Sequence, residues 1–369
     1  MNTSSVFTLA FQTPPPQTQV QIGAGELARL PEWLAPEGPD PHLLLIGDQC
    51  LRARGEALAA ELRQRGWRTD VYWVEVSEAF KDLTQLQPIY SWMLKVGAHR
   101  RSWLLALGGG VIGDAAGFVA ATYMRGLRWL SVPTTLLAQV DSGLGGKTGV
   151  NHPSGKNLIG AFHQPRHLIA DPELLLTLSA RDRLSGYGEM LKYGLIFDPD
   201  FYQQLIEKRD RLLALDPEVL TSAIARCLAL KAEAVAPDEY DQQGVREILN
   251  FGHTFGHALE KLTDYSGFRH GEAVILGMWA ALELSALAGL MPGAASIQAE
   301  LAALPLPVIP AAVTAADLLA ALRHDKKSEG AQVRLILLSA PGCPQIIRDL
   351  PPPLLAQAAQ ALLDRFGAS

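Results

Sequence analysis

The sequence is poor in cysteine and has no excess of basic charge. Its three cysteines, Cys50, Cys227 and Cys343, are far apart and odd in number, so they build neither a disulfide framework nor a CxxC metal clip. The 32 lysines and arginines are outnumbered by 38 aspartates and glutamates. Nucleic-acid recognition usually leaves a basic footprint, so this balance argues against a nucleic-acid partner. A local cluster of cations could still bind an anionic small molecule.

Long apolar runs are also missing. The longest, residues 273–291, contains Glu283 and therefore predicts a buried helix instead of a membrane span. Residues 1–11 lack the basic residues and apolar core of a signal peptide. With 48% hydrophobic and 19% charged residues, the composition excludes intrinsic disorder. We therefore expect a cytoplasmic, globular enzyme with neither a membrane nor a nucleic-acid partner.

The first half of the chain alternates short apolar strands with helical patterns. Strands are predicted at 43–46, 71–74 and 103–107, and helices at 52–65 and 83–97. Strands separated by helices of this length predict a parallel sheet that is covered on both faces. Such sheets bind ligands at the carboxyl ends of their strands, where this chain has glycine turns. The pattern indicates an α/β, Rossmann-like nucleotide-binding unit.

The second half is mostly helical. Helical spacing recurs at 201–215, 217–235 and 247–262, and one strand candidate at 333–338 interrupts the tail. We therefore expect two domains, an α/β domain over residues 1–178 and a mostly α-helical domain over residues 179–369. The first twenty residues, which include three consecutive prolines, are expected to form an irregular or edge lead-in.

A glycine-rich segment follows the third predicted strand. Gly108–Gly113 has the GxGxxG spacing, directly after the strand and before an alanine-rich helix. Glycines let the backbone approach a pyrophosphate, to which the helix N-terminus donates N–H groups. No acidic residue follows at the distance typical of a Rossmann fingerprint, so the alternative is a glycine turn that only packs strand against helix.

A second glycine-rich segment carries two lysines. Residues 141–148 end in GGKT as a phosphate loop does, but Asp141 stands where the first glycine is required, which argues against an ATP cradle. Lys147, Lys156 and Asn157 nevertheless place two cations and an amide in one loop region. The segment predicts an anion pocket, the alternative being solvated surface lysines.

Histidines and a carboxylate suggest a metal site in the second half. His253 and His257 lie four residues apart, on one face of a predicted helix, and Thr254 replaces the glutamate of a zinc protease. Together with His270 and Glu189 they predict a catalytic zinc site with an open position. By spacing alone, His253 and His257 are the favoured ligand pair, and the alternative is histidines that are satisfied within the core.

Two further polar residues lead into the same helix. Arg246 and Asn250 are four residues apart, so both can project toward the histidines. An arginine can hold a carboxylate or a phosphate through two parallel hydrogen bonds. The alternative for Arg246 is an ordinary surface ion pair.

Taken together, these segments resemble the 3-dehydroquinate synthase family of sugar-phosphate cyclases. The matching runs span most of residues 40–340, and a chance match to all of them is implausible. They are Gly108–Asp114, Ala121–Gly126, Val132–Ser142, Gly145–Asn151, Gly155–Phe162, Leu249–Glu260 and His270–Val274.

The resemblance implies a divalent metal and NAD as cofactors. In the family pattern the metal, Zn²⁺ or Co²⁺, is held by Glu189, His253 and His270, so His257 becomes an active-site residue instead of a ligand. The residues that resemble the family's NAD contacts are Asp48, Glu78, Lys81, Gly109, Gly110, Asp114, Thr134, Thr135, Asp141, Lys147, Lys156, Thr177 and Leu178.

The resemblance also implies a substrate site and a homodimer. The phosphate and carboxylate of a keto-acid sugar phosphate would meet Lys147, Asn157, Arg246, Asn250, His257 and Lys327 or its neighbour Lys326. Lys192 and Lys231 would complete the catalytic residues. Arg125 resembles an arginine that the family lends across a dimer interface.

The activity implied by the resemblance converts 3-deoxy-D-arabino-heptulosonate 7-phosphate to 3-dehydroquinate and phosphate, in the shikimate pathway. NAD takes a hydride, phosphate is eliminated, the hydride returns and an aldol step closes the ring. A sister cyclase acting on sedoheptulose 7-phosphate or a related sugar phosphate is an alternative, although such substrates lack the carboxylate expected at Arg246 and Asn250. A glycerol-dehydrogenase-like enzyme and an inactive relative are further alternatives.

The chain departs from the family pattern at three places. Gln49 and Cys50 follow Asp48 where the family commonly has an asparagine two places on, and Gly188 replaces an alanine before Glu189. The segment before Arg246 is one residue longer than usual. Either Asp241 or Gln242 therefore occupies the place of an active-site glutamate.

Overall fold

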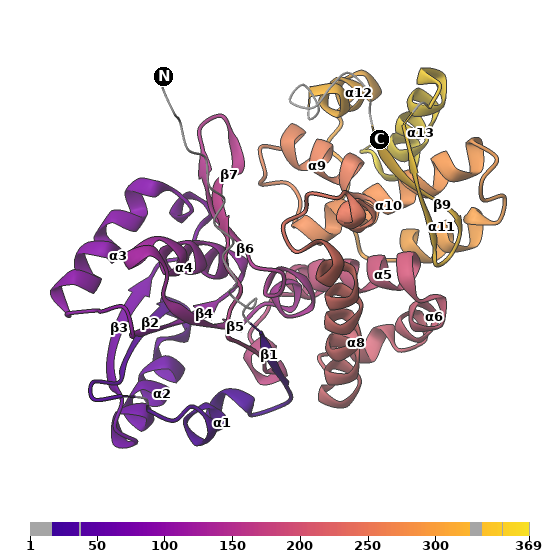
Figure 1. The fold of residues 1–369 in the computed structure, drawn as a ribbon. Coiled ribbons are helices and arrows are strands. Elements are labelled where there is room, and N and C mark those ends of the chain that lie inside the picture. Colours follow the sequence, from indigo (N-terminus) through magenta and orange to yellow (C-terminus); the bar gives the residue numbers. More distant parts are fainter. Residues whose placement is uncertain (1–16, 37, 325–333, 349, 369) are drawn as a thin grey trace, which may run out of the picture.

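The computed structural model describes residues 17–36, 38–324, 334–348 and 350–368. Figure 1 shows two parts of the chain beside each other, a sheet with helices on both of its faces and a half that consists mainly of helices. No helix within these ranges is long and apolar enough to cross a bilayer.

The first part is built on a six-stranded parallel sheet. Its strands lie in the order β1-β8-β5-β4-β2-β3, and every neighbouring pair runs parallel. The predicted strands at 43–46, 71–74 and 103–107 are confirmed as β2, β3 and β4. The bounds are β1 Gln19–Ile22, β2 His42–Asp48, β3 Arg68–Val74, β4 Trp103–Gly108, β5 Arg128–Pro133 and β8 His167–Ala170.

Both faces of this sheet are buried at its centre because β2 and β4 carry uninterrupted apolar runs, at 43–46 and 103–107. Leu43 and Leu45 of β2 pack in one cluster with α1 (Glu26–Trp33) and α2 (Arg52–Gln64). Leu44 and Ile46 point to the opposite face, against α3 (Leu83–Lys95) and α4 (Gly110–Thr122). Successive side chains of a strand alternate between faces, so one uninterrupted run serves both helix layers. Figure 1 shows the helices on the two faces of the sheet.

The strand order changes direction between β2 and β4. From β2 the chain moves outward to β3, then crosses back to β4 and continues to β5 on the other side. Asp48 ends β2, and Gly108 ends β4. In open parallel sheets the crevice beyond two such strand ends is the ordinary ligand site. The topology therefore brings the predicted glycine segment to the expected place.

A two-stranded hairpin joins the sheet to the helical half. Strand β6 (Lys147–His152) pairs antiparallel with β7 (Gly155–Phe162), apart from the six-stranded sheet. In Figure 1 the hairpin rises from the sheet on the side that faces the helices. It carries Lys147, Lys156 and Asn157 and packs against α4.

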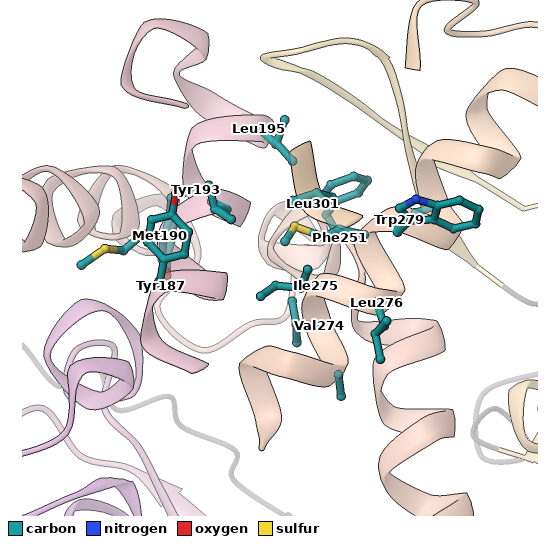
Figure 2. Close-up of a cluster of buried hydrophobic side chains, with 14 of the residues drawn as sticks. Tyr187, Met190, Tyr193, Leu195, Phe251, Val274, Ile275, Leu276, Trp279 and Leu301 are labelled. Atoms are coloured by element: carbon teal, nitrogen blue, oxygen red, sulfur yellow. The ribbon is translucent and has the colours of Figure 1, made fainter. Parts of the chain in front are cut away.

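The second part is a helical bundle with a small hairpin. Helix α10 lies at its centre and is buried without interruption from Gly271 to Leu282. Figure 2 shows its Val274, Ile275, Leu276 and Trp279 among Tyr187, Met190, Tyr193 and Leu195 of α5, with Phe251 and Leu301. The elements are α5 Ala180–Phe197, α6 Pro199–Glu207, α7 Arg209–Leu213, α8 Pro217–Val235, α9 His253–Leu262, α10 His270–Leu287, α11 Ala294–Ala302, α12 Ala315–His324, β9 Leu335–Ala340, β10 Cys343–Ile347 and α13 Pro352–Phe366.

One helix begins later than the sequence predicts. The pattern predicts a helix over 247–262, but Val245–Asn250 is a 3-10 turn and α9 begins at His253. Gly252 separates the two with φ of 80°, and a Cβ there would lie 2.6 Å from Met278 Cγ. The close approach of α10 therefore requires this glycine and its left-handed backbone, and the break makes His253 the first residue of α9.

Two smaller predictions also needed correction. The helix predicted at 201–215 is divided at Lys208 into α6 and α7. The strand predicted at 333–338 is β9, which begins at Leu335 and pairs with β10, a strand that was not predicted. The helix over 217–235 is confirmed as α8.

Candidate active site

Three candidate metal ligands from three helices converge. Glu189 lies in the middle of α5, while His253 and His270 are the first residues of α9 and α10. The Nε2 atoms of both histidines lie 3.5 Å from Glu189 Oε1. One ligand atom from each residue falls within 4.8 Å of the others. Residues 64 and 81 positions apart along the chain thus form one cluster.

The surroundings of the Glu189 carboxylate fit a metal ligand. Its side chain is fully buried, and neither of its oxygens accepts a hydrogen bond from any described residue. Its ion pair with the buried Lys192 supplies one positive charge. A buried carboxylate without hydrogen bonds is costly, and one oxygen with two imidazole nitrogens is a donor set that Zn²⁺ accepts with a position left open.

Close helix contacts hold the three ligands together. Gly271 follows His270, and a Cβ on it would overlap the carbonyl oxygen of Ser185 in α5. Arg181, near the start of α5, binds the buried carboxylate of Glu272 through Nε at 2.8 Å and Nη2 at 2.6 Å. A bidentate pair of this kind fixes orientation as well as distance. The first turns of α5 and α10 are therefore tied to each other beside the ligands.

The protonation of the two histidines differs because their surroundings differ. Burial, with the nearby charge of Lys192, holds the pKa of His253 well below 6.5. Burial acts in the same direction on His270, but the facing carboxylates of Glu189 and Glu260 outweigh it and raise the pKa of His270 to about 10. Two carboxylates, those of Glu189 and Glu260, therefore flank the ring of His270.

A second group shares His270. His257, Glu260 and His270 also place one ligand atom each within 4.8 Å. His253 and His257, the pair favoured by spacing, are in contact as rings, with centroids 5.3 Å apart. They nevertheless fall into different groups, since His253 faces Glu189 and His257 accompanies Glu260.

The start of α4 forms a backbone cradle at the sheet's switch point. Gly109 caps the helix, and Gly110 is its first residue. A Cβ on Gly109 would lie 2.8 Å from Thr135 Cγ2, so a side chain has no room there. Free N–H groups at a helix N-terminus beside such glycines bind a pyrophosphate. The adjacent Thr134 donates its backbone N–H to Gly108 O at 3.0 Å.

A polar network lies beside this cradle. Lys81 is buried, and its Nζ donates to Asp114 Oδ2 at 2.7 Å and to Asn157 Oδ1 at 2.5 Å. Glu78 Oε1 accepts from the side chain of Asn151 at 2.8 Å. The network joins the turn after β3, helix α4 and the hairpin β6–β7.

Three further residues predicted to contact NAD lie at or beyond the carboxyl ends of strands β2 and β8. Asp48, at the end of β2, accepts the backbone N–H of Cys50 at 3.0 Å. Beyond β8, Thr177 is exposed and Leu178 is half-buried. Leu178 donates its backbone N–H to Leu175 O at 2.9 Å.

Buried lysines surround Asp141. Lys231 Nζ donates to Asp141 Oδ1 at 2.5 Å and to its carbonyl oxygen at 2.7 Å, and Tyr193 Oη donates to Oδ1 at 2.6 Å. Burial opposes ionisation, but the charges of Lys231 and Lys192 hold the pKa of Asp141 far below its usual range. Burial lowers the pKa of Lys231, although Asp141 acts against that shift.

Arg246 is buried and has a hydrogen-bond donor available for an anion. The residue is 5% exposed, its Nη1 donates to Glu239 O at 3.1 Å, and its buried Nε has no hydrogen-bond acceptor among the described residues. Gly145, with φ of 104°, gives it room, because a Cβ there would lie 3.3 Å from Arg246 Nη2. Asn250 is exposed at the end of the same 3-10 turn.

One cleft of about 800 Å³ connects the two parts of the chain. It is lined by Gly110, Asp114, Thr135, Lys156 and Asn157 from the sheet and hairpin, and by His257, Glu260 and His270 from the helices. The candidate nucleotide cradle and the candidate metal site therefore open into the same space. A redox cofactor and a Lewis acid could act there on one small molecule.

Comparison with known proteins identifies the family that has this architecture. Residues 71–185 match the family model described as 3-dehydroquinate synthase N-terminal, and residues 186–328 match the model described as 3-dehydroquinate synthase C-terminal. The chain belongs to the 3-dehydroquinate synthase family. The 3-dehydroquinate synthase of Syntrophotalea carbinolica is 42% identical over 343 residues, which cover 92% of this chain and 94% of that protein.

Two solved structures of other synthases share the fold of this chain. The 2-epi-5-epi-valiolone synthase of Streptomyces hygroscopicus, solved with NAD⁺ and Zn²⁺ bound, superposes with a TM-score of 0.85 and 27% identity, over 97% of this chain and 99% of its own. A 2-deoxy-scyllo-inosose synthase complexed with carbaglucose-6-phosphate, NAD⁺ and Co²⁺ gives a TM-score of 0.81 and 25% identity, over 93% and 96%.

Several residues expected from the 3-dehydroquinate synthase family do not line this cleft, among them Asp48, Lys147, Arg246 and Asn250. Arg125 is exposed in the turn after α4, with φ of 67°, and does not line the cleft of its own chain. Lys327, with Lys326, lies outside the described residues.

Sequence reasoning missed two residues that line the cleft. Glu260 follows His253 by seven residues and His257 by three, so the helical period alone could have placed it on their face. Tyr265 has φ of 54°, and Lys156 Nζ lies 3.8 Å from its ring centroid. No sequence signal indicates that contact, because it joins the hairpin to a loop more than a hundred residues away.

Proposed function

We propose that this chain catalyses the 3-dehydroquinate synthase reaction, converting 3-deoxy-D-arabino-heptulosonate 7-phosphate to 3-dehydroquinate and phosphate in the shikimate pathway. The proposal is carried by one observation, that Gly110 at the nucleotide cradle and His270 of the metal cluster line the same cleft. The 42% identity to a curated synthase over 92% of the chain supports the choice of reaction. The NAD⁺ and Zn²⁺ or Co²⁺ bound by the two solved synthases support the choice of cofactors.

The cofactors and the chain have separate tasks. When bound, NAD would accept and return a hydride, and a divalent cation held by Glu189, His253 and His270 would act as a Lewis acid on substrate oxygens. The chain positions these groups. Gly109 and Gly110 keep the backbone at the start of α4 open for the pyrophosphate. Glu189 and Lys192 are buried, and burial strengthens the electrostatic interactions between such groups.

Cations of the chain would bind the two anionic groups of the substrate. The unsatisfied Nε of Arg246 and the exposed Asn250 are proposed to hold the carboxylate. Lys147, Lys156, Asn157 and His257 are proposed to surround the phosphate. Positive charge stabilises the departing phosphate, which takes the proton released from the carbon next to the transient ketone. Asp141 with Lys192 and Lys231 keeps buried charges fixed beside the metal cluster.

The sister cyclases provide the competing candidate. The solved relatives with TM-scores of 0.85 and 0.81 are a valiolone synthase and an inosose synthase, so this fold supports more than one substrate. The deciding assay measures phosphate release from the heptulosonate phosphate with catalytic NAD and zinc, while absorbance reports net NADH. Sedoheptulose 7-phosphate is tested in parallel. Phosphate from the keto acid alone, without net NADH, is expected. Turnover of the carboxylate-free sugar alone would refute the synthase proposal.

A matched pair of variants tests the carboxylate contact. Arg246→Ala should raise KM for the keto acid or reduce kcat, because the buried guanidinium is lost from the site. Arg29→Ala removes a surface arginine whose side chain is 59% exposed and should change neither. Equal kinetics for the two variants would remove Arg246 from the substrate site.

Assembly and location complete the proposal. We propose a homodimer in which Arg125 serves the partner's site, because it is exposed and lies outside the cleft of its own chain. Light scattering tests this, and a monomer with full activity would refute it.

The domain boundary is proposed near residue 178, between β8 and α5. Three separate free cysteines support a reducing, cytoplasmic location, which cell fractionation would test.

A further inference from the structure

The two ring nitrogens of His270 face two different carboxylates. Nε2 points to Glu189 Oε1 at 3.5 Å, within the candidate metal cluster. Nδ1 lies 3.3 Å from Glu260 Oε1 and 3.4 Å from Glu260 Oε2. A neutral imidazole has one N–H donor and one lone pair, and only the lone pair can bind a metal. The carboxylate that accepts the N–H of His270 therefore decides which ring nitrogen keeps the lone pair.

Glu260 is built into the structure at that place. It lies on α9, one helical face with His253 and His257, and is 9% exposed. His270 Nδ1 is almost equally distant from both of its oxygens, so the carboxylate offers two acceptors to one N–H. His270 begins α10, a different helix, so the contact also fixes the ring across the α9–α10 junction.

We propose that Glu260 is a positioning residue that accepts the Nδ1–H of His270. The lone pair of Nε2 is thereby directed toward the cation that Glu189 and His253 would also bind. This inference rests on the proposed metal site, to which it adds the group that orients one ligand. Carboxylates that hold the second nitrogen of a ligand histidine fix its tautomer and increase its basicity. Removing such a partner typically weakens metal binding 10- to 100-fold.

A second cation in the His257, Glu260 and His270 group is the competing interpretation. It would need the lone pair of Nδ1 while Nε2 binds the first cation, so both nitrogens of His270 would have to lose their protons. A neutral imidazole has only one lone pair to give. The geometry therefore favours one cation per chain, with Glu260 as hydrogen-bond acceptor.

Zinc affinity provides the test. Wild type, Glu260→Ala, Glu260→Gln and Glu260→Asp are titrated with zinc against a chromophoric chelator at one pH, and zinc per chain is measured by mass spectrometry. We expect one zinc in wild type, affinity reduced 10- to 100-fold in Glu260→Ala, and partial recovery in Glu260→Asp and Glu260→Gln, both of which keep an acceptor oxygen. Glu218→Gln, at an 88% exposed carboxylate on α8, should bind zinc as wild type does.

Two further measurements separate positioning from a merely structural role. Metal-free Glu260→Gln should remain folded in the absence of urea and still bind zinc more weakly than wild type, whereas a merely structural role would lower the urea midpoint and leave the zinc affinity of the folded variant unchanged. Nitrogen NMR of the zinc-loaded protein should show a protected Nδ1–H on His270 that is lost in Glu260→Ala. If Glu260→Ala does not fold, the isosteric Glu260→Gln provides the decisive titration.

The outcomes that overturn the proposal differ from those that overturn the function. Unchanged zinc affinity in both Glu260→Ala and Glu260→Gln would remove the positioning role while leaving the metal site intact. Two zinc ions in wild type and one in Glu260→Ala would make Glu260 a ligand. Failure of wild type itself to bind zinc would refute the proposed metal function, and with it the basis for this inference.

Discussion

Lys147 and Asp241 form an ion pair that links the first residue of strand β6 to the turn before Arg246. The pair is partly exposed, with 56% of the lysine side chain and 31% of the aspartate side chain accessible. Asp241 has φ of 55°, and Asp238 holds the turn by accepting the backbone N–H groups of Gln242 and Gln243. Of the two residues that could replace the family's glutamate, Asp241 is the one that contacts a lysine.

Substitutions of Asp241 and of its neighbour Gln242 should therefore differ in their effect on activity. Asp241→Ala is expected to lower kcat/KM for the heptulosonate phosphate roughly fivefold, the equivalent of ~1 kcal/mol, because Lys147 loses the group that orients it. Gln242→Ala should stay within about twofold, since only the backbone of Gln242 is used in the turn. Steady-state phosphate release measures both. A larger loss in Gln242→Ala would assign the position to Gln242 instead.

The contact between α5 and α10 should be intolerant of a single added methyl group. Gly271→Ala would place a Cβ on Ser185 O, so the unfolding free energy should fall by about 3 kcal/mol or more and zinc binding should weaken. Gly293→Ala is the matched control, because a Cβ there meets nothing within 4 Å and its φ is −89°. Its effect should remain within about 0.5 kcal/mol in urea denaturation. Equal stability of the two variants would contradict the packing argument.

The ring of Tyr265 should matter through Lys156. Tyr265→Gly removes the ring and accepts the φ of 54° without strain, so the backbone can stay in place. We expect a two- to fivefold rise in KM for substrate or NAD, consistent with ~0.5–1 kcal/mol for a partly exposed cation–π contact. Tyr265→Phe keeps the ring and should remain close to wild type. If the phenylalanine variant is as impaired as the glycine variant, the ring contact is not the cause.

Stability should depend on pH through His42. Burial lowers the pKa of His42 below 6.5; the hydrogen bond to Asp70 opposes the shift, and the charge of Arg68 adds to it. The unfolded chain therefore binds more protons than the native one below pH 6.5, so stability is present above that pH and is lost as pH falls. Urea unfolding at pH 7.5 and 5.5, with chelator present, should show the loss.

His42→Gln provides the control for the pH effect. The variant loses the titrating ring, so the difference in unfolding free energy between pH 7.5 and 5.5 should be smaller than in wild type. His163 and His167 also have a pKa lowered by burial, and their contribution should persist in the variant. An unchanged pH slope would show that His42 does not contribute.

The cofactor half of the fold could be predicted because its signals are local. Runs such as 43–46 are apolar without interruption, which is typical of strands buried on both faces. The turn at Gly108–Gly110 appears directly in the sequence as glycines between a strand and a helix. Strands β1 and β10 were not predicted, because short edge strands with mixed polarity depend on their neighbours more than on their own pattern.

The candidate site could be predicted only in part, since it is assembled across the chain. Spacing favoured His253 with His257, but helix contact pairs His253 with Glu189 and His270, 64 residues before it and 17 after it. The resemblance to the family named that triad, whereas the residue pattern could not. Glu260 and Asp241 act through contacts with other segments, which the sequence does not show. For Glu260 the sequence indicates only a helical face shared with His253 and His257, and for Asp241 only a segment that is one residue longer than usual.

Strand β1 can join its sheet only after β8, a much later segment of the chain, has been made. In β1, Gln19 pairs with His167 of β8, and Thr18 bonds Pro165 across a separation of 147 residues. Closing so long a loop is slow, and β1 has no other partner within the sheet. During synthesis, β5 keeps an open edge until β8 has left the ribosome, and such an edge invites association with other chains. The nucleotide-binding half, although it is translated first, is therefore expected to finish folding only after Ala170 has emerged, close in time to the helical half that completes its cleft.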